Sequence, residues 1–493
     1  MTDDSDRTVD DLERRLARLP WISFHARLKL ALCVIWVLAG IAVGAVAAIG
    51  GPPGHVAWAG GAGALYLAGE AAGVLAGGAA VRRAGRRLPL WFAVAVFVAA
   101  NAAPVLVTGP VAYGGARFAA GLAAGAQYAV VLGVIRELIP RARRTPVMLT
   151  VNALYWLGVA LGTGAQLALA QPGAAPGVPG WSAGLLVAPA LAVLLAGTCG
   201  LLPESPGWLV RHGRVARAAA IVDVAERDAR AAGHQIGRRL PAADPGAGAR
   251  AEPGAAGALG AMLRADRAAT VRAVALCASQ GLVYGGVLFT LVPQLGTVYH
   301  LGLDTAPAYL GAFALANLVG ALGLGRLLTP GGHGPPFAVA HVWAGGLLAL
   351  TGVLMATGIV SPWLVTLLLC AAFLVVAPAS SALIADATER YPAPLRGPAA
   401  RALYAVGRLG AVPGALLFGL PLPGGPPATV ALGYVAVALI LAVTGLIAAS
   451  LRSPGVRRPD DTPFDDGYPS PPSGPDDPPD DRAWMFPPPP GPR

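Results

Sequence analysis

The chain has 493 residues, of which 55% are hydrophobic and only 13% are charged, whereas soluble domains carry about 25% charged residues. Apolar runs of about 18 or more residues recur along it, which excludes an array of soluble domains and indicates a membrane protein with many spans. The formal net charge of +10 does not indicate nucleic-acid binding, because the arginines lie in short loops and not on a face with interleaved aromatic residues.

Residues 1–27 are polar and charged, and no small-residue cleavage site follows them. The first apolar run is therefore predicted to be an uncleaved membrane helix. Hydropathy predicts twelve membrane-spanning helices, six on each side of a polar central region. Their expected ranges are 28–50, 55–81, 88–108, 110–136, 146–170, 181–202, 269–296, 305–328, 336–358, 362–388, 397–420 and 427–451.

This pattern divides the chain into five segments. A cytoplasmic N-terminal segment (1–27) precedes a first six-helix bundle (28–202), and a cytoplasmic central loop (203–268) leads to a second six-helix bundle (269–451). Residues 452–493 form a cytoplasmic tail rich in Pro and Asp, which is expected to be disordered. Within the central loop, residues 214–232 look helical, and the Ala/Gly/Pro stretch at 240–257 is predicted to be a mobile linker.

Arginines are unevenly distributed among the loops, and this predicts the orientation. The loops after the second, fourth and tenth spans are rich in Arg, as is the central loop, whereas the loops after spans one, three, five, seven, nine and eleven hold no Lys or Arg. The positive-inside rule then places both termini and the central loop in the cytoplasm. Lys29 is the single lysine in a chain rich in Ala, Gly and Pro, a composition that favours a bacterial source and hence the cytoplasmic (inner) membrane.

Two of the Arg-rich loops repeat one pattern. Glu137, Pro140 and Arg144 follow the fourth span with the same spacing that Glu389, Pro392 and Arg396 show after the tenth. A Pro just past a helix end stops the helix, and a carboxylate at a helix C-terminus needs a cation nearby because it opposes the helix dipole. The repeat predicts two equivalent charged hairpins, in which Glu137 and Glu389 pair with nearby arginines such as Arg144 and Arg396.

Ionisable side chains within the spans are candidates for function, because burying a charge in a bilayer is costly. Glu70 lies near the middle of the second span, and Arg408 lies well inside the eleventh. We expect Glu70 to pair with Arg408, with Arg117 of the fourth span as the second choice. Asp386 lies near the inner end of span ten, and uncharged polar groups such as Gln127, Gln280, Tyr284 and Asn317 avoid spans three, six, nine and twelve, which are expected to face lipid.

Several stretches together resemble the major facilitator superfamily. They are Arg82-Arg83-Ala84-Gly85-Arg86-Arg87 between spans two and three, Arg117-Phe118-Ala119-Ala120-Gly121 in span four, the paired hairpins, Pro203-Glu204-Ser205-Pro206-Gly207-Trp208 after span six, and Tyr404-Ala405-Val406-Gly407-Arg408 in span eleven. The segment after span six resembles that of the sugar porters and related metabolite:proton branches. The likeness covers nearly all of residues 28–451.

The resemblance implies an all-α fold of two six-helix bundles, with a solute site at their interface near the membrane midplane. It implies a transporter and not an enzyme, in which a sugar or an organic acid crosses the bilayer by alternating access. Protons are the expected coupling ion, because Glu70 is a carboxyl buried in the membrane, and the protein is expected to be a monomer. The candidates are Glu70 and Asp386 for proton coupling; Arg117, Gln127, Gln280, Tyr284, Asn317 and Arg408 for solute binding; and Arg83, Arg86, Glu137, Arg144, Glu389 and Arg396 for gating.

Some features depart from the family pattern and leave alternatives open. Arg82 replaces the family's acidic residue between helices two and three, and Ser279-Gln280 stands where sugar porters carry paired glutamines. The alternatives are a proton-coupled efflux antiporter on the same fold and a sensor or scaffold that transports nothing. No cofactor is implied: there is no Walker-type phosphate loop, the histidines lack metal-ligand spacing, and the four cysteines lie in apolar runs as small hydrophobic residues would.

Overall fold

The structure of the protein is a computed structural model that describes residues 2–49, 59–107, 109–170, 180–236, 255–324, 335–357, 360–419 and 426–451. All of them belong to one unit of the chain, Met1–Arg452. The predicted tail at 452–493 and most of the predicted linker at 240–257 lie outside the described residues.

Regular structure in the described ranges is entirely helical, as expected for membrane spans that must satisfy their own backbone hydrogen bonds. Short 3₁₀ turns, η2 (Ala103–Val105), η3 (Gly184–Leu186) and η4 (Ala196–Leu201), adjoin two of the spans. The α-helices are α1 (Thr2–Ala17), α2 (Ser23–Ile49), α3 (Ala59–Ala84), α4 (Arg87–Ala102), α5 (Pro110–Leu138), α6 (Arg141–Leu169), α7 (Gly180–Ala183), α8 (Val187–Leu195), α9 (Pro206–Arg211), α10 (Val215–Ala231), α11 (Ala255–Ala265), α12 (Arg267–Leu288), α13 (Leu291–Tyr299), α14 (Ala306–Gly323), α15 (Pro335–Ala356), α16 (Pro362–Glu389), α17 (Ala393–Gly419) and α18 (Pro426–Ser450).

Eleven of the described helical segments are long and apolar enough to cross a membrane. They match the predicted spans one to ten and twelve. The remaining predicted span, 397–420, corresponds to α17, which is more polar because it carries Arg396, Arg401 and Arg408. The all-helical, multi-pass membrane fold is thus confirmed, and twelve is an approximate count of its spans.

The seventh predicted span, 269–296, is interrupted in the structure. α12 ends at Leu288 and α13 begins at Leu291. The break is held by polar side chains: the hydroxyl of Thr290 donates to the carbonyl of Gly286, Nε2 of Gln294 donates to Thr290 at 2.5 Å, and Tyr434 of α18 donates to Gln294 at 2.7 Å. Hydropathy alone did not reveal this break, because the flanking residues are apolar.

Small residues bring neighbouring helices close together. α2 packs along α6 and α3 along α5, while α12 packs along α17 and α15 along α18. At Gly121 and Gly125 of α5 there is no room for a side chain: a Cβ would lie 2.0 Å from the carbonyl oxygen of Tyr66 and 2.1 Å from that of Glu70. α5 is therefore in close contact with the backbone of α3 beside Glu70 at these two glycines.

Following the sequence, we call α2–α8 the first half and α12–α18 the second half. The two halves meet along a seam where α3 contacts α17 and α6 contacts α14. The side chain of Phe289 lies against Gly63 near the start of α3, and the side chain of Arg401 lies against Gly78 near its end. Contacts between the halves thus occur near both ends of α3.

Exposed apolar side chains occur on α4, α8, α15 and α18, the helices of spans three, six, nine and twelve, as expected if these spans face lipid. Examples are Phe92, Leu194, Trp343 and Leu439. Exposed apolar side chains also occur on α14, α16 and α17.

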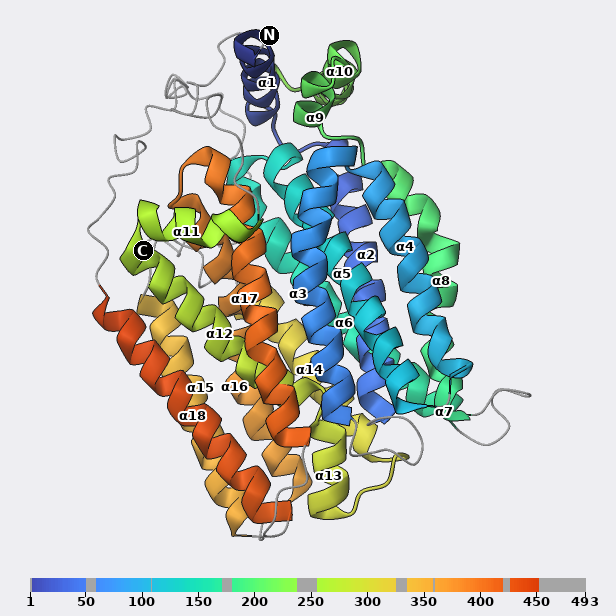
Figure 1. Cartoon of the computed structure of the whole chain (residues 1–493), viewed down its shortest axis with the longest axis vertical. Coiled ribbons are helices and arrows are strands. Elements are labelled where there is room, and N and C mark those ends of the chain that lie inside the picture. Colours follow the sequence, from blue (N-terminus) through green and yellow to red (C-terminus); the bar gives the residue numbers. More distant parts are fainter. Residues whose placement is uncertain are drawn as a thin grey trace, which may run out of the picture. The chain divides into compact units, whose positions relative to one another are not determined.

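Figure 1 shows α1, α9 and α10 at one end of α2–α6 and α13 at the other. We call these the α10 end and the α13 end. α1 packs against α9 and α10 through an apolar face formed by Val9, Leu12 and Leu16. No helix was predicted from the sequence of this polar segment.

Candidate functional site

Glu70 and Arg408 form an ion pair across the seam. Glu70 lies on α3 in the first half with its side chain 1% exposed, and Arg408 lies on α17 in the second half with its side chain 15% exposed. The Nε atom of Arg408 is 3.1 Å from Oε2 of Glu70. The pairing expected from the cost of burying each charge is therefore present.

Tyr404 completes this group one helical turn before Arg408. Its hydroxyl donates a hydrogen bond to Oε1 of Glu70 and accepts one from Nη2 of Arg408 at 2.9 Å. The residues are four apart on α17, so their side chains share one face of that helix. The carboxylate of Glu70 thus has two partners, both from the second half of the chain.

Aromatic rings surround the Glu70–Tyr404–Arg408 group. The guanidinium of Arg408 lies 4.7 Å from the ring centre of Tyr284 and 4.6 Å from that of Tyr404, distances at which cation–π attraction operates. The hydroxyls of Tyr155 and Tyr284 are 2.6 Å apart and join α6 to α12. We call the rings at this group and the rings packed against them the aromatic cage: Trp36, Tyr66, Tyr128, Tyr155, Trp156, Tyr284, Phe289 and Phe313.

Of the rings in this cage, only Tyr284 was predicted from the sequence to be a site residue. The other rings sit in apolar spans where an aromatic residue is unremarkable by itself. Only 6% of the chain is aromatic, so the accumulation of rings near the middle of several spans was the available signal.

The other predicted solute-binding residues are engaged within their own half. Gln127 donates to the carbonyl of Ala93 at 3.3 Å, and Gln280 donates to that of Val376 at 2.6 Å. Arg117 donates to the carbonyl of Ala100 at 3.0 Å and to the side chain of Asn101 at 3.3 Å. The structure therefore does not bring Arg117 to Glu70 as a second partner, because α4 supplies its acceptors.

Two buried polar atoms near the seam have no hydrogen-bond partner among the described residues. They are the hydroxyl of Tyr66 and Oδ1 of Asn317, whose Nδ2 donates to the carbonyl of Phe313 at 2.9 Å. An unpaired polar atom in the interior is costly. Each of these atoms therefore lacks the hydrogen bond that a buried polar group normally makes.

A second charged group lies at the α10 end. Nη2 of Arg86 is 2.8 Å from Oε2 of Glu137, and Nη1 of Arg86 donates to the carbonyl of Pro203 at 3.2 Å. Arg86 is 1% exposed and Glu137 is 25% exposed. The sequence suggested Arg144 as the partner of Glu137, but the pair that the structure shows is with Arg86, which comes from the loop before α4.

Glu204 ties the same loop to the segment before α9. Its carboxylate accepts from the backbone N–H groups of Arg86, Arg87 and Ser205, with the last two at 3.2 and 3.0 Å. Gly85 makes this possible, because it adopts a φ of +76° and a Cβ there would lie 2.8 Å from the Glu204 carboxylate. Ser205 in turn caps α9 by accepting from the N–H of Trp208 at 3.3 Å.

The repeated hairpins share a structural detail. Nε of Arg144 donates to the carbonyl of Ile139 at 3.2 Å, and Nε of Arg396 donates to that of Tyr391 at 2.9 Å. Both bonds reach five residues back and satisfy a carbonyl at the end of the preceding helix.

Three predicted site residues remain: Arg83, Glu389 and Asp386. Arg83 is exposed at the end of α3. Glu389 and Asp386 lie on α16, but their side chains fall outside the described residues. Their predicted roles in gating and proton coupling remain predictions.

α1 is attached to α10 by a cluster of charges around Glu226. This carboxylate is 4% exposed and is met by three arginines: Arg18 at 2.7 Å, Arg15 at 3.0 Å and Arg230 at 3.1 Å. Hydrogen bonds from Arg15 and then from Arg18 lower the pKa of Glu226 to about 2, against the opposing effect of burial. The cluster thus holds the N-terminal helix to the central region through a carboxylate that stays ionised.

Metal chemistry finds no support in the part of the chain that the structure describes. No group of three His, Cys, Asp or Glu side chains there could hold a metal ion. Cys33, Cys199 and Cys277 are buried free thiols and Cys370 is a half-buried one, in agreement with their expected role as small hydrophobic residues.

Comparison with known proteins gives one family match and several similar structures. Residues 51–241 match the family model described as "Sugar (and other) transporter". No curated protein sequence matches the chain. A structure of the xylose transporter XylE from E. coli, in a partially occluded inward-open conformation, is 18% identical, with 87% of this chain and 100% of that chain covered and a TM-score of 0.63.

Two further solved structures resemble the chain to a similar degree. The proton:xylose symporter XylE bound to 6-bromo-6-deoxy-D-glucose is 18% identical, with 85% of this chain and 95% of that chain covered and a TM-score of 0.62. The human organic anion transporter MFSD10 (TETRAN) is 17% identical, with 90% and 99% covered and a TM-score of 0.54. At these identities the likeness concerns the fold, and it extends over nearly the whole of each chain.

Proposed function

We propose that the protein, a multi-pass membrane protein whose fold matches that of solved major facilitator transporters, is a proton-coupled symporter of a small sugar-like solute. One observation carries the proposal: the buried carboxylate of Glu70 in the first half pairs with Arg408 and Tyr404 in the second half. A group that takes up a proton and also joins the halves can link protonation to their movement.

The coupling follows from the cost of an unpaired buried charge. When Glu70 takes up a proton, Arg408 loses its counter-charge in an interior where isolated charges are strongly disfavoured. A solute that offers oxygen acceptors to Arg408 then offsets this loss. Proton and solute therefore favour each other's binding, as symport requires, and binding affinities linked in this way change reciprocally.

Sugar-like solutes suit the surroundings of this group. The aromatic cage offers ring faces for the apolar faces of a sugar ring, and the unpaired Tyr66 hydroxyl and Asn317 Oδ1 offer a donor and an acceptor. Ligand sites of transporters combine such apolar walls with a few polar groups that set orientation. The family match to sugar transporters supports the same class.

The test is Glu70→Gln in purified protein reconstituted into liposomes. The wild type should accumulate its solute above equilibrium when the proton gradient points inward. Glu70→Gln should exchange solute but accumulate none, because no proton moves with it. A thermal-shift screen against pentoses, hexoses and organic acids identifies the solute first, since a ligand that binds the native state raises the melting temperature.

A permanent structural ion pair predicts a different outcome. Glu70→Gln alone would then fold poorly, because it leaves Arg408 buried without a counter-charge, and Glu70→Gln with Arg408→Gln would restore folding. Full proton-driven accumulation by Glu70→Gln would contradict both the coupling role and the structural one.

An organic acid is the second candidate solute. Arg408 favours it, because a guanidinium set between the Tyr284 and Tyr404 rings can bind a carboxylate through two parallel hydrogen bonds. The likeness to a human organic anion transporter fits this candidate. In the thermal-shift screen, stabilisation by organic acids but not by neutral sugars would replace the sugar proposal with this one.

We also propose that the halves act as two six-helix bundles, with the α10 end in the cytoplasm and Arg86–Glu137–Glu204 as a gate at that end. The arginine-rich loops support this orientation through the positive-inside rule. Proton-coupled efflux on the same fold would move the solute and the proton in opposite directions, and a counterflow assay with the solute loaded on either side separates it from uptake.

A further inference from the structure

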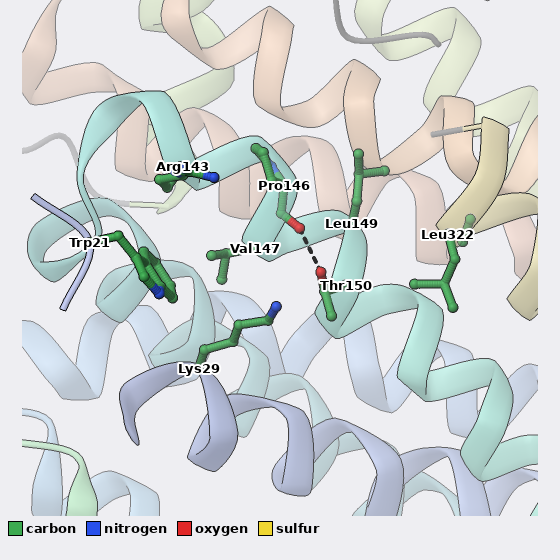
Figure 2. A pocket seen from close by; sticks show the side chains of 9 residues that line it. Trp21, Lys29, Arg143, Pro146, Val147, Leu149, Thr150 and Leu322 are labelled. Atoms are coloured by element: carbon green, nitrogen blue, oxygen red, sulfur yellow. Dashed lines mark hydrogen bonds between the residues drawn. The ribbon is translucent and has the colours of Figure 1, made fainter. Parts of the chain in front are cut away.

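A cavity of about 310 Å³ opens at the α10 end, away from the Glu70 group. It lies where the start of α2, the first turns of α6 and the last turns of α14 come together (Figure 2). Its lining residues are Trp21, Lys29, Arg143, Pro146, Val147, Leu149, Thr150, Ala321 and Leu322.

The lining combines two cations with several apolar side chains. Figure 2 shows Trp21 and Arg143 on one side and Leu149 and Leu322 on the other, with the Lys29 side chain reaching between them toward Thr150. None of these nine described residues is acidic. A site with two cations and no carboxylate is built for an anion, and the apolar side suits a hydrocarbon chain attached to it.

The position of the cavity along the helices agrees with a membrane boundary. Trp21 immediately precedes α2, and Lys29 is less than two turns inside that helix. Trp at the head-group level and Lys or Arg reaching toward it are typical of the polar boundary of a bilayer. Leu322 on α14 and Leu30 beside Lys29 are exposed apolar side chains at the same level.

We propose that this cavity binds an anionic phospholipid, with its phosphate between Lys29 and Arg143 and an acyl chain along Leu149 and Leu322. Basic pockets between membrane helices on the cytoplasmic side are suited to anionic head groups. The lining comes from both halves, since α2 and α6 belong to the first and α14 to the second. A lipid bound here therefore contacts both halves of the chain at the place where α6 meets α14.

The test measures lipid retained by the purified full-length protein. Wild type is placed in nanodiscs of phosphatidylcholine with a minority of phosphatidylglycerol, released, and analysed by native mass spectrometry. The variant is Lys29→Gln with Arg143→Gln. The control is Arg217→Gln, which removes one charge from an exposed position on α10 at the same end.

The expected result is selective retention of phosphatidylglycerol by wild type and by Arg217→Gln. Each cation near an anionic lipid contributes about fivefold to binding, so the double variant should lose roughly 25-fold. Equal retention by all three proteins would show a general annulus of lipid and would overturn the proposal.

A second variant separates a lipid from a soluble phosphate. Leu322→Trp fills the apolar side without changing charge, and it should lower retention of phosphatidylglycerol. Inorganic phosphate is titrated in phosphatidylcholine nanodiscs as the other arm. Two results together would assign the cavity to a free anion and overturn the lipid proposal. Phosphate would stabilise the protein only when Lys29 and Arg143 are present, and Leu322→Trp would leave lipid retention unchanged.

Discussion

The hydroxyl of Tyr404 donates a hydrogen bond to the carboxylate of Glu70 across the seam between the two halves. The same hydroxyl accepts from Arg408 at 2.9 Å, so it is in contact with both charges of the ion pair. Tyr404 is therefore the uncharged member of the group, and together with Arg408 it joins Glu70 to the second half of the chain.

Tyr404→Phe should fold normally and lose most proton-driven accumulation. The variant keeps the ring but removes a hydrogen bond to a charged group, a bond worth about 1.5–3 kcal/mol. Tyr128→Phe is the matched control, because its hydroxyl makes only a 3.4 Å contact with Asn152 and its ring also packs in the cage. Equal loss of accumulation in the two variants would contradict a specific role of the Tyr404 hydroxyl in proton coupling.

Glu137→Gln should change the transport rate more than the melting temperature. Arg86 is 1% exposed, but Glu137 is 25% exposed and a glutamine in its place still offers Arg86 an oxygen acceptor, so only part of the pair's contribution to folding is lost. Stopped-flow uptake and thermal unfolding in detergent measure the two effects, with Arg217→Gln, at an exposed position on α10, as the control. Wild-type uptake by Glu137→Gln would mean that the hairpin after α5 is only a turn.

Gly125→Val should destabilise the protein and impair transport together. A side chain at this position has to displace the backbone of α3 beside Glu70, and overpacking of this kind costs about 1–3 kcal/mol. Gly115→Val on the same helix is the control, because nothing lies within 4 Å of a Cβ built there. Similar melting temperatures for the two variants would contradict the close packing of α3 and α5.

The attachment of α1 should weaken in acid. The pKa of Glu226 is lowered to about 2 in the folded chain, so the stability that the cluster contributes is fully present above the ordinary pKa of Glu and is lost as pH falls from there toward about 2. Hydrogen exchange of α1, corrected for the intrinsic pH effect, should rise over that window. Glu226→Gln should show fast exchange already at neutral pH, and slow exchange in this variant would disprove the role of the cluster.

Labelling of single cysteines tests the proposed orientation. His234→Cys lies just beyond α10, and Asp304→Cys lies between α13 and α14; both positions are exposed. In a background without the four native cysteines, an impermeant thiol reagent added to whole cells should label position 304 and not 234. The reverse pattern would invert the orientation and move the Arg86–Glu137 group to the outer side.

The fold could be predicted because its determinants are local. Apolar runs set the spans, and Pro140 and Pro392 mark the hairpins, so the all-helical membrane fold and the resemblance to sugar transporters were both accessible from sequence. The Glu70–Arg408 pair was accessible for a different reason, because the cost of two isolated charges in apolar helices leaves few alternatives.

Other features depend on contacts between distant segments and could not be read locally. Arg86 reaches Glu137 because the loop before α4 folds over the end of α5, and nothing in either loop indicates the other. The break before α13 depends on Tyr434 of α18. α1 could have been predicted, because Val9, Leu12 and Leu16 are spaced as one face of a helix. It was not predicted, because the segment is short and highly charged.

The two ends of the seam should respond differently to ionic strength. Arg401 lies against the last turns of α3, where helix carbonyls carry partial negative charge. At the other end Phe289 packs on Gly63 and Tyr66 without any charge. Because salt weakens partly exposed charge interactions but leaves apolar contacts intact, added salt should weaken the contact at the α10 end more than the one at the α13 end, and a conformational step that breaks the α10-end contact should be salt-sensitive.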